Sequence, residues 1–530
     1  MTQTHVIIHS VLFLIKLSLI LVNSNFTTSL LHFTLPAHRR GIFSAYPDCR
    51  FTKSSKMAPS QLKPLVLLCD GTWCGREAGT KTNIYLLAKM IGIPIDNPND
   101  LDEHFFPSTG QPDNGKRARY IHGVGLGSTF LDYVFNAITA QDMAEQCISA
   151  YRYIVANYVE GETEIWMFGL SRGAYTVRCV GGMINNCGIV KTDGLNNNQI
   201  DLLCREVYRI YRSPYKVDEP HSDQSINFRK KASWPLIGRE DPNRKPPIRF
   251  MGLFDTVGEL GIPTFTGGVG LDWPKFYDEN VSSVVEHVYQ AVSLHDRLYI
   301  FQPCLARRDT KSGKFKDKDP KEWKITEKWF PGVHYDLGRQ RFKFLRDAGG
   351  APLERFLSKV GFASKVIEPN HVLADLALRW MLEAIREHDR ESLVIENVSE
   401  EKNIKKEIEK LGESIVAGNG KIGDGDVYNR IVEYAPFGEL GLKIWMTITG
   451  TGSQVNVIYE VLFARRNRHI PDNSAEVYNY KIVDPEVSTN ISIKELAGID
   501  DTSGDKVENE KKRYPSRTLD AWTLRKDVSQ

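Results

Sequence analysis

The most constraining feature of this sequence is an alternation, from about residue 63 onward, between short apolar runs and longer segments with apolar residues at helical spacing. The runs 64–72, 164–171 and 247–261 end in glycine or polar residues, as buried strands do. The segments 139–159 and 172–190 have the periodicity of helices. This alternation predicts an α/β fold with a mostly parallel central sheet flanked by helices.

Residues 281–296 extend this prediction by one more helix. Val281, Val284, Val285 and Val288 fall on one stripe at helical spacing, which is typical of a helix packed on a core. We therefore expect a helix here.

The changes in composition along the chain predict five parts. Within the largest part we expect an apolar helix over 373–385 and a polar, proline-containing insertion or lid over 212–247. The parts are an N-terminal extension over 1–58, a catalytic domain over 59–395, a charged helix and linker over 396–426, a strand-containing segment over 427–495 and a disordered tail over 496–530.

Composition excludes two classes of function. The 68 basic and 66 acidic residues leave a formal charge of +2, so there is no electrostatic reason to expect nucleic acid as a partner. The eight cysteines form neither a CxxC pair nor a Cys/His cluster at zinc spacing. We therefore expect no metal and no other cofactor.

The apolar run at 6–22 resembles a signal peptide or membrane anchor, but His9 and Lys16 interrupt it and no basic residue precedes it. Met57 stands just before the first predicted strand. We therefore expect translation to start at Met57 and the protein to be cytoplasmic. In the alternative, residues 1–24 are a targeting segment and the protein is membrane-anchored or secreted.

The segment "FGLSRGAYTVR" contains the strongest chemical signal. Gly169, Ser171 and Gly173 fit G-x-S-x-G, with an apolar strand before them and a helix rich in small residues after them. In a nucleophile elbow the serine adopts a strained backbone conformation, and small neighbours let strand and helix approach. The pattern predicts Ser171 as a nucleophile; the simpler alternative is a tight turn without catalysis.

A nucleophilic serine needs a histidine base and an acid that orients the base, in the chain order Ser, Asp or Glu, His for this fold. Asp255 follows an apolar run, and His334 lies further on in "WFPGVHYDLG". The order is the expected one, and each residue comes at the carboxyl end of a strand-like run, where ligands collect in open α/β sheets. Ser171, Asp255 and His334 are therefore the predicted catalytic residues.

Three other residues near these positions compete for the roles of acid and base. His295 and Asp296 could supply either, but we interpret Asp296 as structural. Asp336 is too close to His334 in sequence to be the preferred orienting acid.

The oxyanion hole of such a site uses the backbone N–H after the nucleophile and another N–H from an early loop. These requirements predict Arg172, with Gly71 or Thr72 as the second donor. The same "DGT" resembles the motif of aspartate-nucleophile phosphatases. There the nucleophile would stand two residues before Asp70, where this chain has Leu68.

A set of motifs in order resembles the α/β-hydrolase domain family of bacteria and fungi that includes type VI secretion phospholipase effectors. The resemblance covers residues 63 to about 390 and is more similar to the fungal branch. Its motifs are "LLCDGTW", "KTNIYLLAKMI", "YIHGVGLG", "FGLSRGAYTVR", "FMGLFDTVGELGIP", "AVSLHDRL" and "WFPGVHYDLG".

The resemblance implies an α/β-hydrolase-like fold with insertions and a C-terminal extension, and a serine hydrolase with lipase or phospholipase activity. It assigns the nucleophile to Ser171, the acid to Asp255 and the base to His334. The family often has glycines where this chain has Arg339 and Gln340, so the loop after the histidine differs.

Together these observations predict a serine hydrolase that cleaves a carboxylic ester, foremost a lipid or phospholipid, and that contacts membranes peripherally if at all. The alternative is a hydrolase-fold scaffold or regulatory binding protein without turnover. The sequence leaves the head group, the acyl chain and the oligomeric state open.

Overall fold

The residues that the computed structural model describes all belong to one compact unit, formed by Leu62–Val427 with Ala464–Gln530. The predicted extension over 1–58 and the predicted tail over 496–530 lie outside the described residues. The described residues are 62–71, 81–95, 104–105, 117–123, 140–235, 246–258, 264–265, 271–272, 280–298, 301–308, 325–341, 366–389, 391–395, 403–416, 468–469 and 475–477.

An eight-stranded sheet forms the centre of the unit, in the order β10-β9-β8-β5-β4-β1-β3-β2. Every neighbouring pair is parallel except β2 with β3. A separate antiparallel pair joins β6 to β7. The strands are β1 (Lys63–Cys69), β2 (His104–Phe105), β3 (Arg117–Ile121), β4 (Thr163–Leu170), β5 (Ile248–Phe254), β6 (Thr264–Phe265), β7 (Leu271–Asp272), β8 (Val285–Ser293), β9 (Ile325–Phe330) and β10 (Ala475–Val477).

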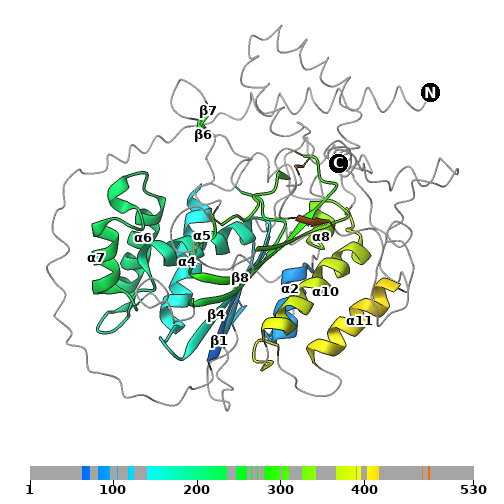
Figure 1. The fold of residues 1–530 in the computed structure, drawn as a ribbon, viewed down its shortest axis with the longest axis horizontal. Helices are drawn as coiled ribbons and strands as arrows, with labels where there is room; N and C mark the ends of the chain where they lie inside the picture. The colour runs from blue at the N-terminus through cyan, green and yellow to red at the C-terminus, as the bar shows by residue number, and fades with distance from the viewer. Residues whose placement is uncertain are drawn as a thin grey trace, which may run out of the picture. The chain divides into compact units, whose positions relative to one another are not determined.

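Helices cover both faces of this sheet, as Figure 1 shows. On one face α5 packs on β1, β4 and β5, with α4, α6 and α7 beside it; on the other, α2 packs on β1 and β4, and α10 on β8 and β9. The helices are α2 (Asn83–Ile91), α4 (Ala140–Asn157), α5 (Arg172–Cys187), α6 (Asn197–Arg212), the 3₁₀ turn η2 (Lys216–Asp218), α7 (Asp223–Ala232), α8 (His334–Leu337), α10 (His371–His388) and α11 (Ile404–Val416). The α/β-hydrolase-like fold predicted from the sequence is therefore confirmed.

The covered sheet explains the apolar runs. A parallel sheet with helices on both faces buries both sides of its strands, so the runs are continuous rather than alternating. In β1, Leu65 through Cys69 are fully buried. The strands predicted at 64–72 and 164–171 overlap β1 and β4, which each begin one residue earlier, and the range 247–261 contains β5. The helices predicted at 139–159 and 172–190 contain α4 and α5, and the range 373–385 lies within α10.

The helix predicted over 281–296 is wrong, because this segment contains strand β8. β8 lies between β5 and β9, in parallel with both, and its carboxyl half is buried throughout. Of the four valines in the stripe, Val285 and Val288 lie in β8 and the other two precede it, so the helical spacing combined a strand with the segment before it. The abundance of β-branched valine was the better indicator, since it favours strands.

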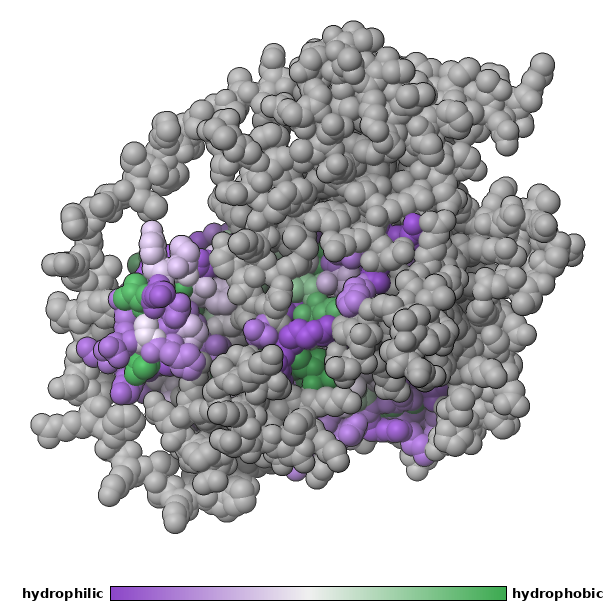
Figure 2. Space-filling model, turned by 45° about the horizontal axis from the view of Figure 1, so that its top comes forward, coloured by the Kyte–Doolittle hydropathy of each residue, from purple (hydrophilic) through white to green (hydrophobic). Residues whose placement is uncertain are grey.

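The insertion at 212–247 is not a lid over Ser171 in its described part. Its helix α7 and turn η2 contact the far end of α5, where Ser233 Oγ donates to Cys187 O at 2.6 Å and Asn186 Nδ2 donates to Asp218 O at 3.0 Å. The 16 residues of α5 put this end about 24 Å from Ser171. In Figure 2 the region of α6 and α7, at the left, shows a mainly hydrophilic surface with isolated hydrophobic spots.

Two C-terminal segments join the main unit. The charged segment predicted over 396–426 contains α11, which packs against α10. Of the strand-containing segment over 427–495, the structure describes 468–469 and 475–477, and the latter form β10 at the edge of the main sheet.

Candidate active site

Ser171 is the single residue between strand β4 and helix α5. Its φ is 56° and its ψ −121°, in a region that costs L-residues about 1–3 kcal/mol. Its N–H donates to Phe254 O at 2.9 Å, which fixes the turn to the neighbouring strand β5. The strained conformation and its position at the carboxyl end of a central strand are those of a nucleophile elbow.

The glycines of the motif are required by close approach of the backbone. A Cβ on Gly169 would lie 2.5 Å from Ala174 Cα, and a Cβ on Gly173 would lie 2.2 Å from Cys69 O. Neither distance is tolerated by real side chains. Small residues two before and two after Ser171 therefore let α5 start directly against the ends of β1 and β4.

Asp255 comes directly after β5, next to the elbow, and is completely buried. Its own φ of 40° is also positive, and its N–H donates to Ala291 O at 2.7 Å. Ser293 donates to both carboxylate oxygens, from its backbone N–H at 2.9 Å and from its hydroxyl at 3.1 Å. The carboxylate is thus held in place by the end of strand β8.

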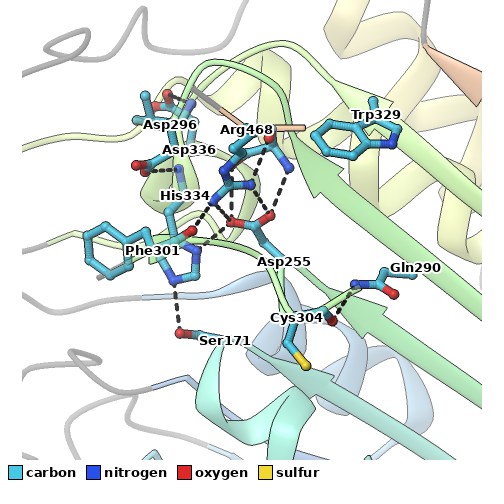
Figure 3. Close-up of polar contacts among 12 residues, drawn as sticks. Ser171, Asp255, Gln290, Asp296, Phe301, Cys304, Trp329, His334, Asp336 and Arg468 are labelled. Atoms are coloured by element: carbon cyan, nitrogen blue, oxygen red, sulfur yellow. Dashed lines mark hydrogen bonds and ion pairs between the residues drawn. The ribbon is translucent and has the colours of Figure 1, made fainter. Parts of the chain in front are cut away.

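His334 begins the short helix α8 after β9 and links the other two residues. Its Nε2 lies 2.9 Å from Ser171 Oγ, and its Nδ1 lies 2.6 Å from Asp255 Oδ2. The ring stacks on Phe301 with centroids 4.6 Å apart and planes 12° apart. Figure 3 shows the chain of contacts from Ser171 through His334 to Asp255.

The protonation of Asp255 decides the direction of these bonds. Burial raises the pKa of its carboxyl, but the charge of Arg468 and the contacts with His334 and Arg468 outweigh burial and hold the pKa well below its usual range. An ionised carboxylate can only accept, so the proton of the neutral imidazole lies on Nδ1 of His334. Nε2 is then left to accept from the hydroxyl of Ser171.

Arg468 is the contact that the sequence did not predict. Its guanidinium donates to both oxygens of Asp255, at 2.6 and 3.0 Å, and its side chain is completely buried. It lies 213 positions after Asp255, and no local pattern marks it. Phe301 was also missed, since an aromatic residue in an irregular segment gives no signal of its own.

The predicted oxyanion donors are only partly described. Arg172 is the first residue of α5, so its backbone N–H lies at the positive end of the helix dipole beside Ser171. The N–H of Gly71 donates to Asp70 Oδ1 at 2.7 Å, so it can serve an oxyanion only by exchanging that bond. Thr72 lies outside the described residues.

Asp70, the residue of the phosphatase alternative, has its carboxylate occupied by neighbours. Besides Gly71, Oδ2 accepts from Thr82 Oγ1 at 2.6 Å and from Tyr120 OH at 2.5 Å. These bonds tie the end of β1 to the start of α2 and to the end of β3. Asp70 therefore fixes the loop at this edge of the sheet.

His295, Asp296 and Asp336 fix the backbone of the loop that carries His334. Asp296 Oδ2 accepts the backbone N–H of His334 at 3.0 Å, and His295 Nδ1 accepts the N–H of Gly332 at 2.9 Å. Asp336 accepts from the N–H groups of Val333 and Asn370. These bonds all go to backbone N–H groups, so the three side chains hold the loop that carries His334.

Arg339 lies in the loop after His334 and has an unusual backbone conformation. Its φ of 57° lies in the left-handed region that favours glycine. Its guanidinium forms an ion pair with Asp375 of α10. This contact is available only to the arginine and offsets part of the backbone strain.

The described residues show no sign of a metal centre or of a membrane span. Within those ranges, no group of three or more histidine, cysteine, aspartate or glutamate side chains is arranged to hold a metal ion. Among the helices described, none combines the length and the apolar character that a bilayer span requires.

Comparisons with known proteins give relatives of low identity. An uncharacterized protein of Saccharomyces cerevisiae, YEL023C, is 27% identical over 235 residues, which are 44% of this chain and 31% of that protein. The chain thus spans about a third of the length of this curated relative. The crystal structure of an uncharacterized protein from Pseudomonas aeruginosa aligns with a TM-score of 0.30 and 15% identity, over 67% of this chain and 51% of that one.

The family comparison extends over more of the chain. Residues 63–384, from the first residue of β1 nearly to the end of α10, match the family described as "T6SS, Phospholipase effector Tle1-like, catalytic domain". The match covers more than half of the chain and includes Ser171, Asp255 and His334. This chain belongs to the Tle1-like phospholipase effector catalytic domain family.

Proposed function

We propose that the protein is a serine hydrolase that cleaves carboxylic esters, with Ser171 as nucleophile, His334 as base and Asp255 as the acid that orients the base. The observation that carries this proposal is the unbroken hydrogen-bond chain through these three residues, with Ser171 at the elbow between β4 and α5. A glycine-rich turn without catalytic function would need neither the strained serine nor its contact with a histidine.

The first half of the reaction forms an acyl-enzyme. His334 Nε2 takes the proton of the Ser171 hydroxyl as Oγ attacks the carbonyl carbon, and the carbonyl oxygen becomes an oxyanion. The backbone N–H of Arg172 stabilises that charge. The tetrahedral intermediate collapses, the ester oxygen leaves, and His334 returns the proton to it.

The second half releases the acid. His334 Nε2 removes a proton from water, which attacks the acyl carbon, and Ser171 leaves with its proton restored. Asp255 keeps Nδ1 protonated and stabilises the imidazolium that forms in each half. The steps proposed here use only residues of this chain and water.

Family membership supports a lipid substrate. The family is described as a phospholipase effector catalytic domain, so we propose that the ester cleaved here is a phospholipid or a neutral lipid. Arg339 and Gln340 stand in the loop after the base, where the family resemblance implies glycines, so the head group bound here can differ from that of the bacterial effectors.

The test is hydrolysis of a lipid panel by the full chain and by Ser171→Ala. The panel contains phosphatidylcholine, phosphatidylethanolamine, phosphatidylglycerol and a triacylglycerol, and the products are followed by mass spectrometry. We expect release of fatty acid from at least one of them, lost by a factor on the order of 10⁵ or more in Ser171→Ala.

Ser233→Ala is the matched control. It removes another buried serine hydroxyl, at the opposite end of α5, and should leave hydrolysis within about twofold. Equal hydrolysis by the parent and Ser171→Ala, or none by the parent on this panel and on short-chain nitrophenyl esters, would overturn the proposal.

A further inference from the structure

We propose that Arg468 is a positioning residue for Asp255, so that the site is complete only when a segment beyond the family's catalytic domain packs into it. The inference rests on the proposed function. The matched domain ends at residue 384, and Arg468 lies 84 positions further along the chain.

The guanidinium of Arg468 makes four hydrogen bonds, two from each terminal nitrogen. One nitrogen donates to Asp255 Oδ1 at 2.6 Å and to Ser293 O at 2.7 Å. The other donates to Asp255 Oδ2 at 3.0 Å and to Phe301 O. Figure 3 shows this fork on the side of Asp255 that faces away from Ser171.

This geometry requires arginine. Two parallel N–H donors match the two carboxylate oxygens, and the same two nitrogens reach carbonyls on separate segments. A lysine would supply the charge from a single nitrogen and could not span these four acceptors. Complete burial of both side chains strengthens their electrostatic interaction, because water does not screen it.

Arg468 acts on the acid and, through a second route, on the base. Asp255 accepts from Ser293, His334 and Arg468, so the fork fixes the plane of the carboxylate that the His334 ring must meet. The carbonyl of Phe301 accepts from the same guanidinium, and the Phe301 ring stacks on His334. Loss of Arg468 therefore loosens both supports of the imidazole.

The charge of Arg468 also sets the proton affinity of the site. Asp255 at the end of β5 and Asp296 at the end of β8 each interact electrostatically with both His334 and Arg468. Burial raises the pKa of Asp296, while Arg468 and His334 oppose that rise. Arg468 is the largest of the charges that lower the pKa of the Asp255 carboxyl, so its removal raises that pKa.

The experiment compares the full chain with Arg468→Gln and Arg468→Lys on the substrate found in the lipid panel. In Arg468→Gln we expect kcat to fall by about tenfold or more with KM unchanged, because Arg468 does not touch substrate. The acidic limb of kcat/KM should move up by about one pH unit, because the buried site binds a proton more readily without that cation. Arg468→Lys should keep the position of the limb and lose less of kcat.

Arg249→Gln is the matched control. It breaks another ion pair at the opposite end of the same strand, β5, about 20 Å from Asp255. Its kcat and acidic limb should equal those of the parent. If Arg468 has only a structural role, Arg468→Gln should lower the melting temperature and leave the acidic limb of kcat/KM at the same pH.

The outcomes separate this inference from the proposed function. If Ser171→Ala is inactive while Arg468→Gln keeps the kcat and the limb of the parent, the inference fails and the proposed function stands. If Ser171→Ala remains active, the proposed function fails. Should Arg468→Gln not fold, Arg468→Lys decides, because a kcat equal to that of the parent would overturn the need for the fork.

Discussion

An ion pair lies near each end of strand β5, and the two pairs differ in burial and in origin. At the amino end, Arg249 of β5 and Glu286 of the neighbouring strand β8 form a pair with 2.5 Å between Nη1 and Oε1. Their side chains are 16% and 20% exposed. At the carboxyl end Asp255 meets Arg468, 213 positions away, and both side chains are fully buried. One pair follows from the strand pairing, whereas the other requires a remote segment to arrive.

The difference indicates what each pair is for. A partly exposed pair between adjacent strands contributes less to stability than its short distance suggests, because water still reaches both side chains. A fully buried pair loses the hydration of both charges, so that a well-packed apolar pair would often be as stable. The buried pair at Asp255 is therefore better explained by the chemistry proposed for that carboxylate than by stability.

The largest effect is expected at the buried pair. Asp255→Asn removes the acceptor charge that keeps Nδ1 of His334 protonated, and it leaves the Arg468 cation without its counter-charge. We expect kcat to fall by about 10⁴, and the free energy of unfolding to fall by about 3–5 kcal/mol. Steady-state kinetics and denaturant unfolding measure the two losses.

Glu286→Gln is the corresponding change at the partly exposed pair of Arg249 and Glu286. It should leave kcat unchanged and lower the stability by at most about 1 kcal/mol, because solvent screens this pair. Comparable losses of kcat in the two variants would remove the distinction between the two ends.

Two glycines of helix α5, Gly173 at its start and Gly181 further along, differ in the space around them. In Gly173→Ala the new methyl would lie 2.2 Å from Cys69 O and 2.5 Å from Asp70 O, both rigid backbone atoms, so the helix start and Ser171 must shift. A displacement of about 1 Å at a reacting group costs about 10²-fold in rate. In Gly181→Ala the nearest atom is the flexible Met251 Cε at 3.2 Å, so activity should be retained.

Ester hydrolysis and thermal unfolding of both alanine variants test this prediction. Since alanine favours helices over glycine, Gly181→Ala should be at least as stable as the parent. Full activity in Gly173→Ala would show that the close contact at the start of α5 is not needed.

The smallest expected effect is the change of protein stability with pH that comes from the partly exposed pair of Arg249 and Glu286. Burial raises the pKa of Glu286, but His287 and Arg249 outweigh it and hold the pKa at about 2. Because this folded value lies below the unfolded value of about 4.3, the contribution of Glu286 is present above that value. It is lost as the pH falls towards about 2.

Arg249→Gln should therefore lower the melting temperature by at most about 2 °C at pH 7. The difference from the parent should shrink as the pH falls below about 4, and calorimetry across this range measures it. A difference that grows as the pH falls would contradict the pKa direction.

The sequence predicted the parts of this protein that local patterns determine. The strand before Ser171 and the helix after it follow from apolar runs and small residues. The order of Ser171, Asp255 and His334 along the chain suggested that the sheet would bring them together. The structure places them within hydrogen-bond distance, and their catalytic role stays a prediction.

Two features could not be predicted, for different physical reasons. β8 was mistaken for a helix because a strand buried on both faces loses its alternation, and its valines happened to fall at helical spacing. Arg468 was missed because its partner is 213 positions away, and a single arginine near the end of a long chain has no periodicity. Long-range charge pairs of this kind are set by tertiary packing alone.

The most direct test of the account is covalent labelling of the full chain with a fluorophosphonate, which reacts with activated serines. We expect one adduct per molecule, located at Ser171 by peptide mass spectrometry, and none in Ser171→Ala or in denatured protein. Labelling of the folded parent and of Ser171→Ala to the same extent, or no adduct on the active parent, would contradict the assignment of Ser171 as the nucleophile.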